Sequence, residues 1–308
     1  MRAVQFHTYG GVEVLQIDDV AIPDPGPGQV LIQVEASAVH PGDVVARSGG
    51  FAAVIEARAA YRPGWDFAGR VQATGPGVDD LAVGTAVVGM TDWLRDLNGT
   101  HAEFVVLDRS AVVAAPRSLG ADAAAALPVD ALTASQALDL LGLTSGDTLV
   151  VLGAAGAVGG FALELAVGRG LRVLGVAGRA DEPVITARGG VFVDRDDDLG
   201  RAVQALAPGG ADALFDTASV ATPALAAIRD GGSYCGVIHP FAPLPERGIA
   251  VSTVGVHSNP DTLAGLVHLV DTGELTLRVA AHYPLADAAQ AHTHLAKGGT
   301  RGAVVLLP

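Results

Sequence analysis

Cysteine is almost absent from this chain: of its 308 residues, only Cys235 carries a thiol. A single thiol cannot form an internal disulfide, and it cannot build a zinc site from several cysteines. Long hydrophobic runs are also absent, since no apolar stretch approaches the roughly 20 residues that a membrane-spanning helix needs. The first residues lack the uninterrupted apolar core of a signal peptide. We therefore expect a cytoplasmic protein with no membrane partner.

Basic residues are few, because 19 Lys and Arg stand against 33 Asp and Glu, which gives a net charge of −14. This charge repels nucleic acid, so we expect no nucleic-acid partner. Any anionic ligand must then be held by a local group of donors. Hydrophobic residues make up 50% of the chain, which is enough for a sizeable core. The length favours two domains or one large domain.

The pattern along the chain changes near residue 122. Before it, short Val-rich segments alternate with Gly and Pro turns such as 23–29, which is typical of a small barrel or sandwich. After it comes an Ala/Leu-rich helical stretch with a break at Pro128. Strands and helices then alternate, which predicts βαβ units and a parallel sheet with helices on both faces. The last fifty residues return to mixed structure.

The stretch 148–166, TLVVLGAAGAVGGFALELA, passes from a strand through glycines into a helix. Gly153 would permit a tight exit from the strand, Gly156 would let the backbone approach a pyrophosphate, and Gly159 would let the helix pack closely. The anion would bind the free N–H groups at the helix start. This context predicts a dinucleotide site. The alternative is an ordinary turn in a chain with 40 glycines.

The end of the next predicted strand bears on the choice of cofactor. An NAD site usually carries an acidic residue there for the ribose hydroxyls. This chain has Gly178 followed by Arg179, whose guanidinium could bind a 2′-phosphate in bidentate fashion. We therefore expect NADPH. The alternative is a surface arginine neutralised by Asp181 or Glu182.

Four segments in this order resemble the medium-chain dehydrogenase/reductase superfamily, and within it the zinc-independent quinone oxidoreductase (zeta-crystallin-like) branch. They are PGPGQVLIQVEASAVHPGDVVARSG (25–49), GWDFAGRVQATGPGVDDLAVGTAVVG (64–89), HAEFVVLDRSAVVAAPRSLGADAAAALPVDALTASQAL (101–138) and HYPLADAAQAHTHLAKGGTRGAVVLLP (282–308). The resemblance implies an α/β fold. Residues 1–116 and 256–308 would form a GroES-like β-barrel catalytic domain, and residues 117–255 a Rossmann domain with a doubly wound parallel sheet.

The residues at the superfamily's zinc-ligand positions predict no metal. His40 stands at the place of the cysteine ligand, and Trp65-Asp66 stand where a histidine and a glutamate would be. One possible ligand is too few, because a catalytic zinc needs about three protein ligands and a water. His292 and His294 are two apart on a predicted helix and cannot face one metal together.

The resemblance also implies the cofactor contacts. Gly156, Ala157 and Val158 would hold the pyrophosphate, Thr217 would lie near the adenosine, Thr133, Val237 and Ile238 would lie at the nicotinamide, and His239 would lie at its edge.

His40 and Tyr61 are the candidate catalytic residues. Many relatives have asparagine in place of His40 and tyrosine in place of Phe51, and related enoyl reductases use a tyrosine in this region as proton donor. Tyr61 is the nearest replacement. His40 could donate a proton, since histidine titrates near neutral pH. Alternatively, His40 is only a helix-start residue that touches the nicotinamide ribose.

The resemblance implies an NADPH-dependent, metal-free oxidoreductase that transfers a hydride to a small hydrophobic conjugated substrate, a quinone or an enone. One alternative is a cofactor-binding protein of the same fold without significant turnover. Another is a dehydrogenase of a different substrate class that uses a metal. A homodimer is expected, with the apolar segment 248–256 as its edge strand.

Overall fold

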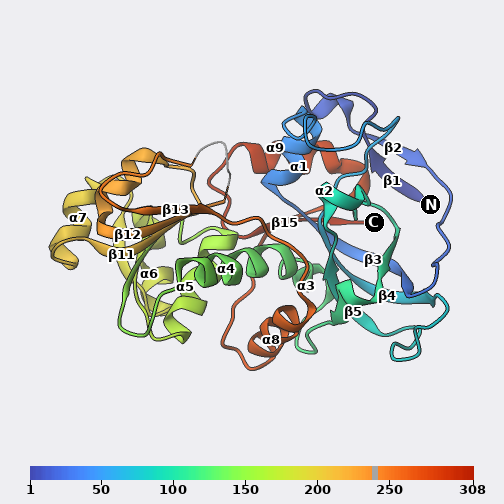
Figure 1. The fold of residues 1–308 in the computed structure, drawn as a ribbon. Helices are drawn as coiled ribbons and strands as arrows, with labels where there is room; N and C mark the ends of the chain where they lie inside the picture. Colours follow the sequence, from blue (N-terminus) through green and yellow to red (C-terminus); the bar gives the residue numbers. More distant parts are fainter. Residues whose placement is uncertain (238–241) are drawn as a thin grey trace. The chain divides into compact units, whose positions relative to one another are not determined.

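The computed structural model covers residues 1–308 and describes all of them except 238–241 (Figure 1). The chain forms two compact units. The terminal unit is built from both ends of the chain: Met1–Val129, His257–Gly273 and Leu277–Pro308. The central unit consists of Asp130–Val256 and Glu274–Thr276.

The terminal unit runs past the predicted boundary at residue 116. The reason is α3 (Ala121–Ala124), a short helix that packs against β3 (Gln29–Val39) and β4 (Asp66–Thr74) of that unit. Pro128 then begins α4 (Pro128–Leu141), so the predicted break between two helices lies between α3 and α4.

Six strands form the sheet of the central unit, in the order β10-β9-β8-β11-β12-β13, and every neighbouring pair is parallel. Their bounds are Thr148–Leu152 (β8), Arg172–Ala177 (β9), Val191–Asp194 (β10), Ala211–Asp216 (β11), Ile228–Gly236 (β12) and Ala250–Thr253 (β13). β8 is buried along its whole length. This burial explains its uninterrupted apolar sequence, which is typical of a parallel strand covered on both faces.

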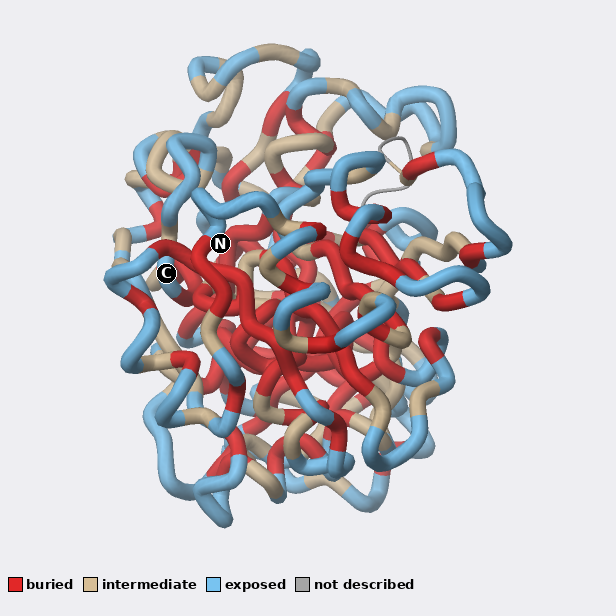
Figure 2. Tube along the Cα trace, turned by 90° about the vertical axis from the view of Figure 1, so that its left-hand side faces the viewer, coloured by how far each residue is buried: buried red, intermediate tan, exposed pale blue. Residues whose placement is uncertain are grey.

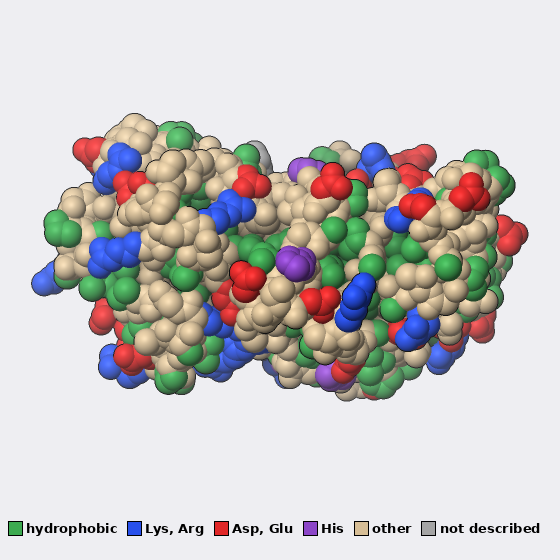
Figure 3. Space-filling model, turned by 90° about the horizontal axis from the view of Figure 1, so that it is seen from below, with side chains coloured by type: hydrophobic (Ala, Val, Ile, Leu, Met, Phe, Trp, Pro, Cys, Tyr) green, Lys and Arg blue, Asp and Glu red, His purple; other side chains and the backbone are tan. Residues whose placement is uncertain are grey.

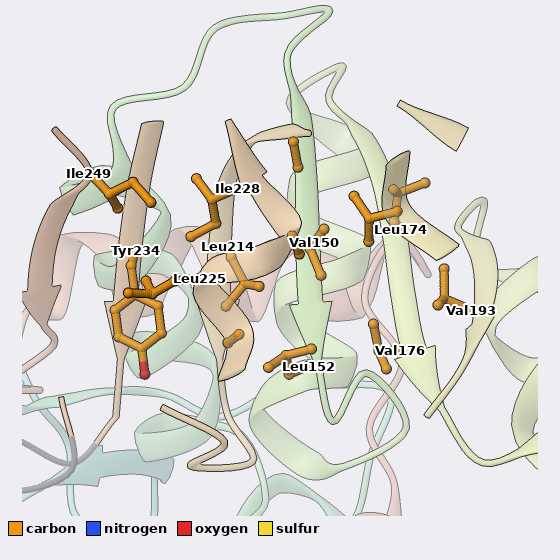
Figure 4. Close-up of a cluster of buried hydrophobic side chains, with 14 residues drawn as sticks. Val150, Leu152, Leu174, Val176, Val193, Leu214, Leu225, Ile228, Tyr234 and Ile249 are labelled. Carbon is orange, nitrogen blue, oxygen red and sulfur yellow. The ribbon is translucent and has the colours of Figure 1, made fainter. Parts of the chain in front are cut away.

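Helices connect these strands, as the alternating pattern predicts. They are α5 (Ala157–Gly168), α6 (Glu182–Ala187), α7 (Leu199–Leu206) and the short 3₁₀ turns η3 (Arg179–Asp181) and η4 (Thr222–Ala227). Alternate residues of the strands, such as Val150 and Leu174, point to one face of the sheet and form a core with Leu225 of η4 (Figure 4). Each such buried side chain contributes roughly 1.5–3 kcal/mol of hydrophobic stabilisation.

The strand order reverses between β8 and β11. From β8 the chain adds β9 and β10 on one side, then returns to add β11, β12 and β13 on the other. The register pairs Leu152 with Asp216, so the carboxyl ends of β8 and β11 lie side by side. In sheets of this topology, ligands bind where the connections leaving two such strands diverge.

The terminal unit contains a mainly antiparallel sheet in the order β14-β15-β3-β4-β5-β7, with β6 also paired to β3, and a separate β1-β2 pair. The remaining bounds are Arg2–Gln5 (β1), Gln16–Asp19 (β2), Ala86–Met90 (β5), Phe104–Asp108 (β6), Val112–Ala114 (β7), Val279–Pro284 (β14) and Ala303–Leu307 (β15). β15 pairs with β3, which joins the two ends of the chain in one sheet. The predicted two-part α/β fold is confirmed.

Two apolar clusters stabilise the terminal unit. Ile32 and Phe67 belong to one, and Val39 and Leu306 belong to the other. The helices of this unit are α1 (Pro41–Ser48), α2 (Trp93–Asp96), α3, α8 (Pro260–Asp271) and α9 (Ala288–Ala296). Figure 2 shows that buried segments of the chain lie mainly in the interior, whereas exposed segments lie mainly at the outside. No helix of the described chain combines the length and apolar character needed to cross a membrane.

Two segments that the sequence pattern predicts as strands, VEVLQID (12–18) and LTLRVA (275–280), differ from the structure. Residues 12–18 begin as the 3₁₀ turn η1 (Val12–Val14), and the Glu13 carboxylate accepts a hydrogen bond from the Gly11 amide at its start. Residues 275–280 become a strand only from Val279, because Glu274–Thr276 belong to the central unit. There the Thr276 amide donates to Glu164.

Candidate cofactor and active site

The connection between β8 and α5 is built around glycines. Gly153 has φ +71°, a left-handed conformation that side chains other than hydrogen rarely allow, and it turns the chain out of β8. A Cβ on Gly159 would lie 2.2 Å from the carbonyl oxygen of Gly153, so only glycine lets α5 start this close to the loop. A Cβ on Gly156 would meet the same oxygen at 3.2 Å. The result is a tight turn in which Gly153, Gly156 and Gly159 place no side chain over the backbone.

The first turn of α5 presents its backbone N–H groups. Gly156 is the N-cap residue, and the described structure shows neither a side-chain cap nor an acidic residue in this turn. Ala157 and Val158 follow, at positions that no intrahelical carbonyl can reach. Their amides and the positive end of the helix dipole suit an anion. These residues fit the pyrophosphate of a dinucleotide cofactor.

Thr217 connects the end of β11 to the glycine loop. Its hydroxyl donates a hydrogen bond of 2.6 Å to the carbonyl oxygen of Leu152, the last residue of β8. The Thr217 Oγ1 itself lies 2.7 Å from the position of a Cβ on Gly153. Thr217 therefore lies against the glycine loop, and its predicted place near the adenosine stays a prediction.

The carboxyl end of β9 carries the predicted NADPH residues. Gly178 precedes η3, and the Arg179 guanidinium is 80% exposed. Its Nη2 lies 2.7 Å from Oδ2 of Asp194, the last residue of β10, whose side chain is only 6% exposed. Asp194 thus forms the ion pair with Arg179 that the sequence suggested for Asp181 or Glu182.

Arg195 is a residue of this site that the sequence prediction missed. Its Nη2 lies 3.0 Å from the position of a Cβ on Gly178, and its amide donates to the carbonyl oxygen of Ala177. The guanidinium therefore lies over the end of β9. A signal was available in VFVDR (191–195), because the carboxyl ends of neighbouring parallel strands meet at one edge of a sheet.

The predicted nicotinamide contacts are described only in part. Thr133 is 6% exposed and lies in the second turn of α4. Val237 follows the end of β12 and is half-buried. Ile238 and His239 lie outside the described residues. The roles of all four residues remain predictions.

His40 and Asp66 form a buried pair in the terminal unit. Nε2 of His40 lies 3.0 Å from Oδ2 of Asp66, and the two side chains are 7% and 0% exposed. The Asp66 carboxylate also accepts hydrogen bonds from the amides of Ala38 and Val129, both at 3.2 Å. The contact between Nε2 and Oδ2 fixes the orientation of the imidazole ring.

The residues at the superfamily's zinc-ligand positions do not fit a catalytic zinc. They offer one imidazole and one carboxylate, which are bonded to each other, and an indole that cannot ligate. Trp65 instead packs against Phe51 and Trp93, with ring centroids 6.4 and 5.6 Å away. Elsewhere in the described chain, no three His, Cys, Asp or Glu side chains lie where they could hold a metal ion.

Tyr61 has its hydroxyl fully engaged in the loop after α1. It donates to the Glu56 carbonyl oxygen at 3.1 Å and accepts from the Arg58 amide at 2.9 Å and from the Tyr9 hydroxyl at 3.2 Å. One donor and two acceptors are the full capacity of a phenol. The ring also stacks on Phe6 at 5.2 Å. These contacts give Tyr61 a structural role, and its function as proton donor stays a prediction without support from this geometry.

Two family sequence models match the chain. The alcohol dehydrogenase GroES-like domain matches residues 26–117, and the zinc-binding dehydrogenase model matches residues 189–306. The first lies in the terminal unit, and the second extends from the central unit to β15.

Curated relatives match the whole chain at modest identity. A quinone oxidoreductase of Lama guanicoe is 29% identical over 100% of this chain and 97% of its own length. A 2-methylene-furan-3-one reductase of Solanum lycopersicum is 28% identical over 100% of this chain and 79% of its own length.

Solved structures match the same fold. An NAD-dependent alcohol dehydrogenase has a TM-score of 0.89 at 29% identity and covers 100% of both chains. A mycobacterial protein, solved in complex with NADPH, has a TM-score of 0.85 at 27% identity and also covers 100% of both chains. The names of the two proteins give different cofactors, so the comparison supports a nicotinamide cofactor and does not decide between NADPH and NADH.

The GroES-like match, the doubly wound sheet and the relatives over the full chain agree with one another. The chain is an oxidoreductase that belongs to the medium-chain dehydrogenase/reductase superfamily, among its quinone oxidoreductase-like members.

Proposed function

We propose that this oxidoreductase uses NADPH to reduce small, hydrophobic, conjugated acceptors, namely quinones or enones, and that it does so without a metal. The observation that carries the proposal is the bare glycine loop at the start of α5 together with Arg179 and Arg195 at the ends of β9 and β10. The loop suits the pyrophosphate that both nicotinamide dinucleotides share. The guanidinium groups suit the 2′-phosphate that only NADPH carries.

Asp194 is the residue that argues for NADH, because a carboxylate at this edge can bind ribose hydroxyls. Its Oδ2 is already paired with Arg179 at 2.7 Å. Arg195 adds a second cation, so these three side chains together carry one positive charge. Asp196 and Asp197 follow on the exposed surface, where solvent and salt screen their charges. Asp198 accepts a hydrogen bond from the Arg201 amide as the N-cap of α7.

The proposed class of acceptor follows from how the protein could stabilise the negative charge that develops on the acceptor during the reaction. When bound, the nicotinamide supplies a hydride, and the acceptor then gains electron density on oxygen. Zinc-bearing enzymes stabilise an alkoxide through the metal, whereas His40, Trp65 and Asp66 do not fit a zinc. A quinone or enone spreads the charge over its conjugated system. It needs mainly orientation and one or two hydrogen bonds.

His40 is the candidate proton donor in this proposal. The Asp66 carboxylate holds the imidazole by Nε2 and so fixes the direction in which the ring points. The names of two relatives, a quinone oxidoreductase and a 2-methylene-furan-3-one reductase, support acceptors of this class.

The test is NADPH oxidation, followed at 340 nm, with benzoquinone, naphthoquinones, enones and enoyl thioesters, each with and without EDTA. We expect turnover of quinones or enones that survives the chelator, and no oxidation of simple alcohols. Activity that disappears with EDTA and returns with zinc would overturn the metal-free part. Binding of NADPH without turnover of any conjugated acceptor would favour a non-catalytic role instead.

A further inference from the structure

Asp216 ends β11 and is fully buried, at the point where the strand order of the central sheet reverses. Its Oδ1 accepts a hydrogen bond from the Ala218 amide at 3.0 Å. Its Oδ2 accepts from the Ala221 amide at 2.8 Å and from the Tyr234 hydroxyl at 2.9 Å. Burial, and then the charge of Asp216, raises the pKa of Tyr234, so the phenol stays protonated and donates. Two backbone amides and one hydroxyl therefore donate to this buried carboxylate.

The segment that Asp216 holds, residues 217–221, has a strained backbone. Ser219 has φ +56°, and Ala221 has φ +62° with ψ −127°. Residues with a Cβ rarely adopt either conformation, and that of Ala221 is the one that glycine normally supplies in a type II′ turn. Strain of this kind persists only where the surrounding contacts fix it. The bonds from Asp216 to Ala218 and Ala221 are such contacts.

This strained segment lies against the glycine loop. A Cβ on Gly153 would meet the Thr217 hydroxyl at 2.7 Å and the Ala218 Cβ at 3.5 Å. Gly153 follows β8 and the segment follows β11, so the two connections flank the place where ligands bind in a sheet of this order. The shape of the segment therefore determines one wall of the dinucleotide site.

We propose that Asp216 is a positioning residue for the cofactor: its buried carboxylate fixes residues 217–221 in the shape that lets a nicotinamide dinucleotide lie on the glycine loop. This role rests on the cofactor part of the proposed function and does not depend on the acceptor. It acts on the backbone wall that both cofactors share, so it concerns NADPH and NADH equally.

Asp216→Asn tests this role, because an amide has one accepting oxygen and cannot serve the amides of both Ala218 and Ala221. In the cofactor-free protein, we expect faster hydrogen exchange of the peptide that covers 217–221. In titrations of folded protein, we expect the Kd of NADPH and that of NADH each to rise about tenfold. Tyr234→Phe is the matched control, since it leaves both backbone bonds in place. We expect its Kd values to stay within about twofold of wild type.

A second substitution separates positioning from simple loss of stability. Adding Ala221→Gly to Asp216→Asn removes the penalty for the left-handed backbone, so we expect part of the lost affinity to return. A merely structural role would lower the melting temperature of Asp216→Asn and leave both Kd values unchanged, and that result would overturn the proposal.

The Ala221→Val variant and cofactor binding by the wild-type protein test the proposal further. If Asp216→Asn does not fold, Ala221→Val in the wild-type background opposes the same backbone shape with a β-branched side chain. Unchanged exchange and unchanged Kd in that variant would overturn the role. Wild-type protein that binds neither cofactor would overturn both this role and the proposed function. Wild-type protein that binds a cofactor but reduces no conjugated acceptor would overturn only the acceptor assignment.

Discussion

Arg179 and Arg195 reach one edge of the central sheet from different strands. Arg179 follows β9 and is tied to Asp194, whereas Arg195 follows β10 and lies over Gly178. A guanidinium can bind a phosphate through two parallel hydrogen bonds, which gives selectivity as well as affinity. Because both arginines are at the surface, their contribution depends on how far a bound phosphate excludes water from them.

Removing either arginine should change the preference between the cofactors. We expect Arg195→Gln to raise the Kd of NADPH about tenfold, since one charge-assisted hydrogen bond is lost, and to leave that of NADH nearly unchanged. Arg179→Gln should have a larger effect, because it also releases the Asp194 carboxylate to repel the phosphate. Fluorescence titration of each variant with NADPH and with NADH measures the two Kd values. Arg201→Gln, at an exposed position of α7, is the control and should leave both Kd values unchanged. Equal losses of affinity for NADPH and NADH in the Arg179 and Arg195 variants would contradict the assignment.

At the residue scale, His292 is a buried histidine that links protonation to the stability of the fold. It lies on α9 with no exposed surface, and among the described residues neither ring nitrogen has a hydrogen-bond partner. The pKa of His292 is lowered to about 4, mainly by burial; Asp43 raises it, whereas His101 and Arg47 contribute to the lowering. The neutral ring is thus part of the folded state, and a proton cannot be added without cost.

The stability of the protein should therefore fall in mild acid. Unfolded His292 takes up a proton below about pH 6.5, whereas the folded ring does so only near pH 4. The free energy of unfolding should then decrease as the pH falls through this window, by about 2 kcal/mol at pH 5 from this group. Urea titrations of His292→Leu should show a shallower decrease than wild type. His268→Leu, at an exposed position, should keep the wild-type slope; equal slopes in all three would refute the assignment.

At the scale of elements, α5 depends on glycine at one position and not at another. A Cβ on Gly159 would lie 2.2 Å from the Gly153 carbonyl oxygen and 3.0 Å from the Ala154 Cα, and both atoms are backbone. A Cβ on Gly168, at the end of the same helix, would meet nothing within 4 Å. The first glycine therefore sets the distance between the helix and the loop, and the second has no such function.

Gly159→Ala should reduce both stability and cofactor binding. We expect the free energy of unfolding to fall by about 1–3 kcal/mol, because the backbone must shift, and the Kd of NADPH and NADH to rise together. Gly168→Ala should gain up to about 1 kcal/mol from helix propensity and bind both cofactors as wild type does. Urea denaturation and cofactor titration measure the two quantities. A Gly159→Ala variant with wild-type affinity would show that the close packing does not shape the site.

The sequence predicted the elements well where one local pattern decides them. The apolar run of β8, the glycine loop and the start of α5 are contiguous, and the structure has them in that order. Residues 275–280 were misjudged because Glu274–Thr276 pack in the other unit, which strand propensity cannot reveal. Arg195 and the hydrogen bonds of Asp216 were missed for the same reason. Arg195 meets Gly178 across β9 and β10, and Asp216 meets Tyr234 across β11 and β12, so both contacts depend on how neighbouring strands pair in the sheet.

At the scale of the whole molecule, the chain carries a net charge of −14. On the face shown in Figure 3, acidic and basic side chains are interspersed, and no extended basic area is present there. An anionic cofactor must therefore be attracted by a few local groups, which are the start of α5 and the two arginines. This dependence on local charge explains why single substitutions at that edge are expected to alter affinity strongly.

We propose that the protein forms a homodimer joined through β13. This strand is the edge of the central sheet next to β12, and its residue Ala250 is exposed. An uncovered edge strand is a template for pairing with a second chain.

Light scattering at micromolar concentration should give about twice the 31.0 kDa of one chain. Ala250→Lys should give monomers, because charge on an edge strand opposes pairing. Val191→Lys, on β10 at the opposite edge, is the matched control and should leave the dimer intact. A monomeric wild-type protein, or a dimer that survives Ala250→Lys but not Val191→Lys, would show that β13 is not the interface.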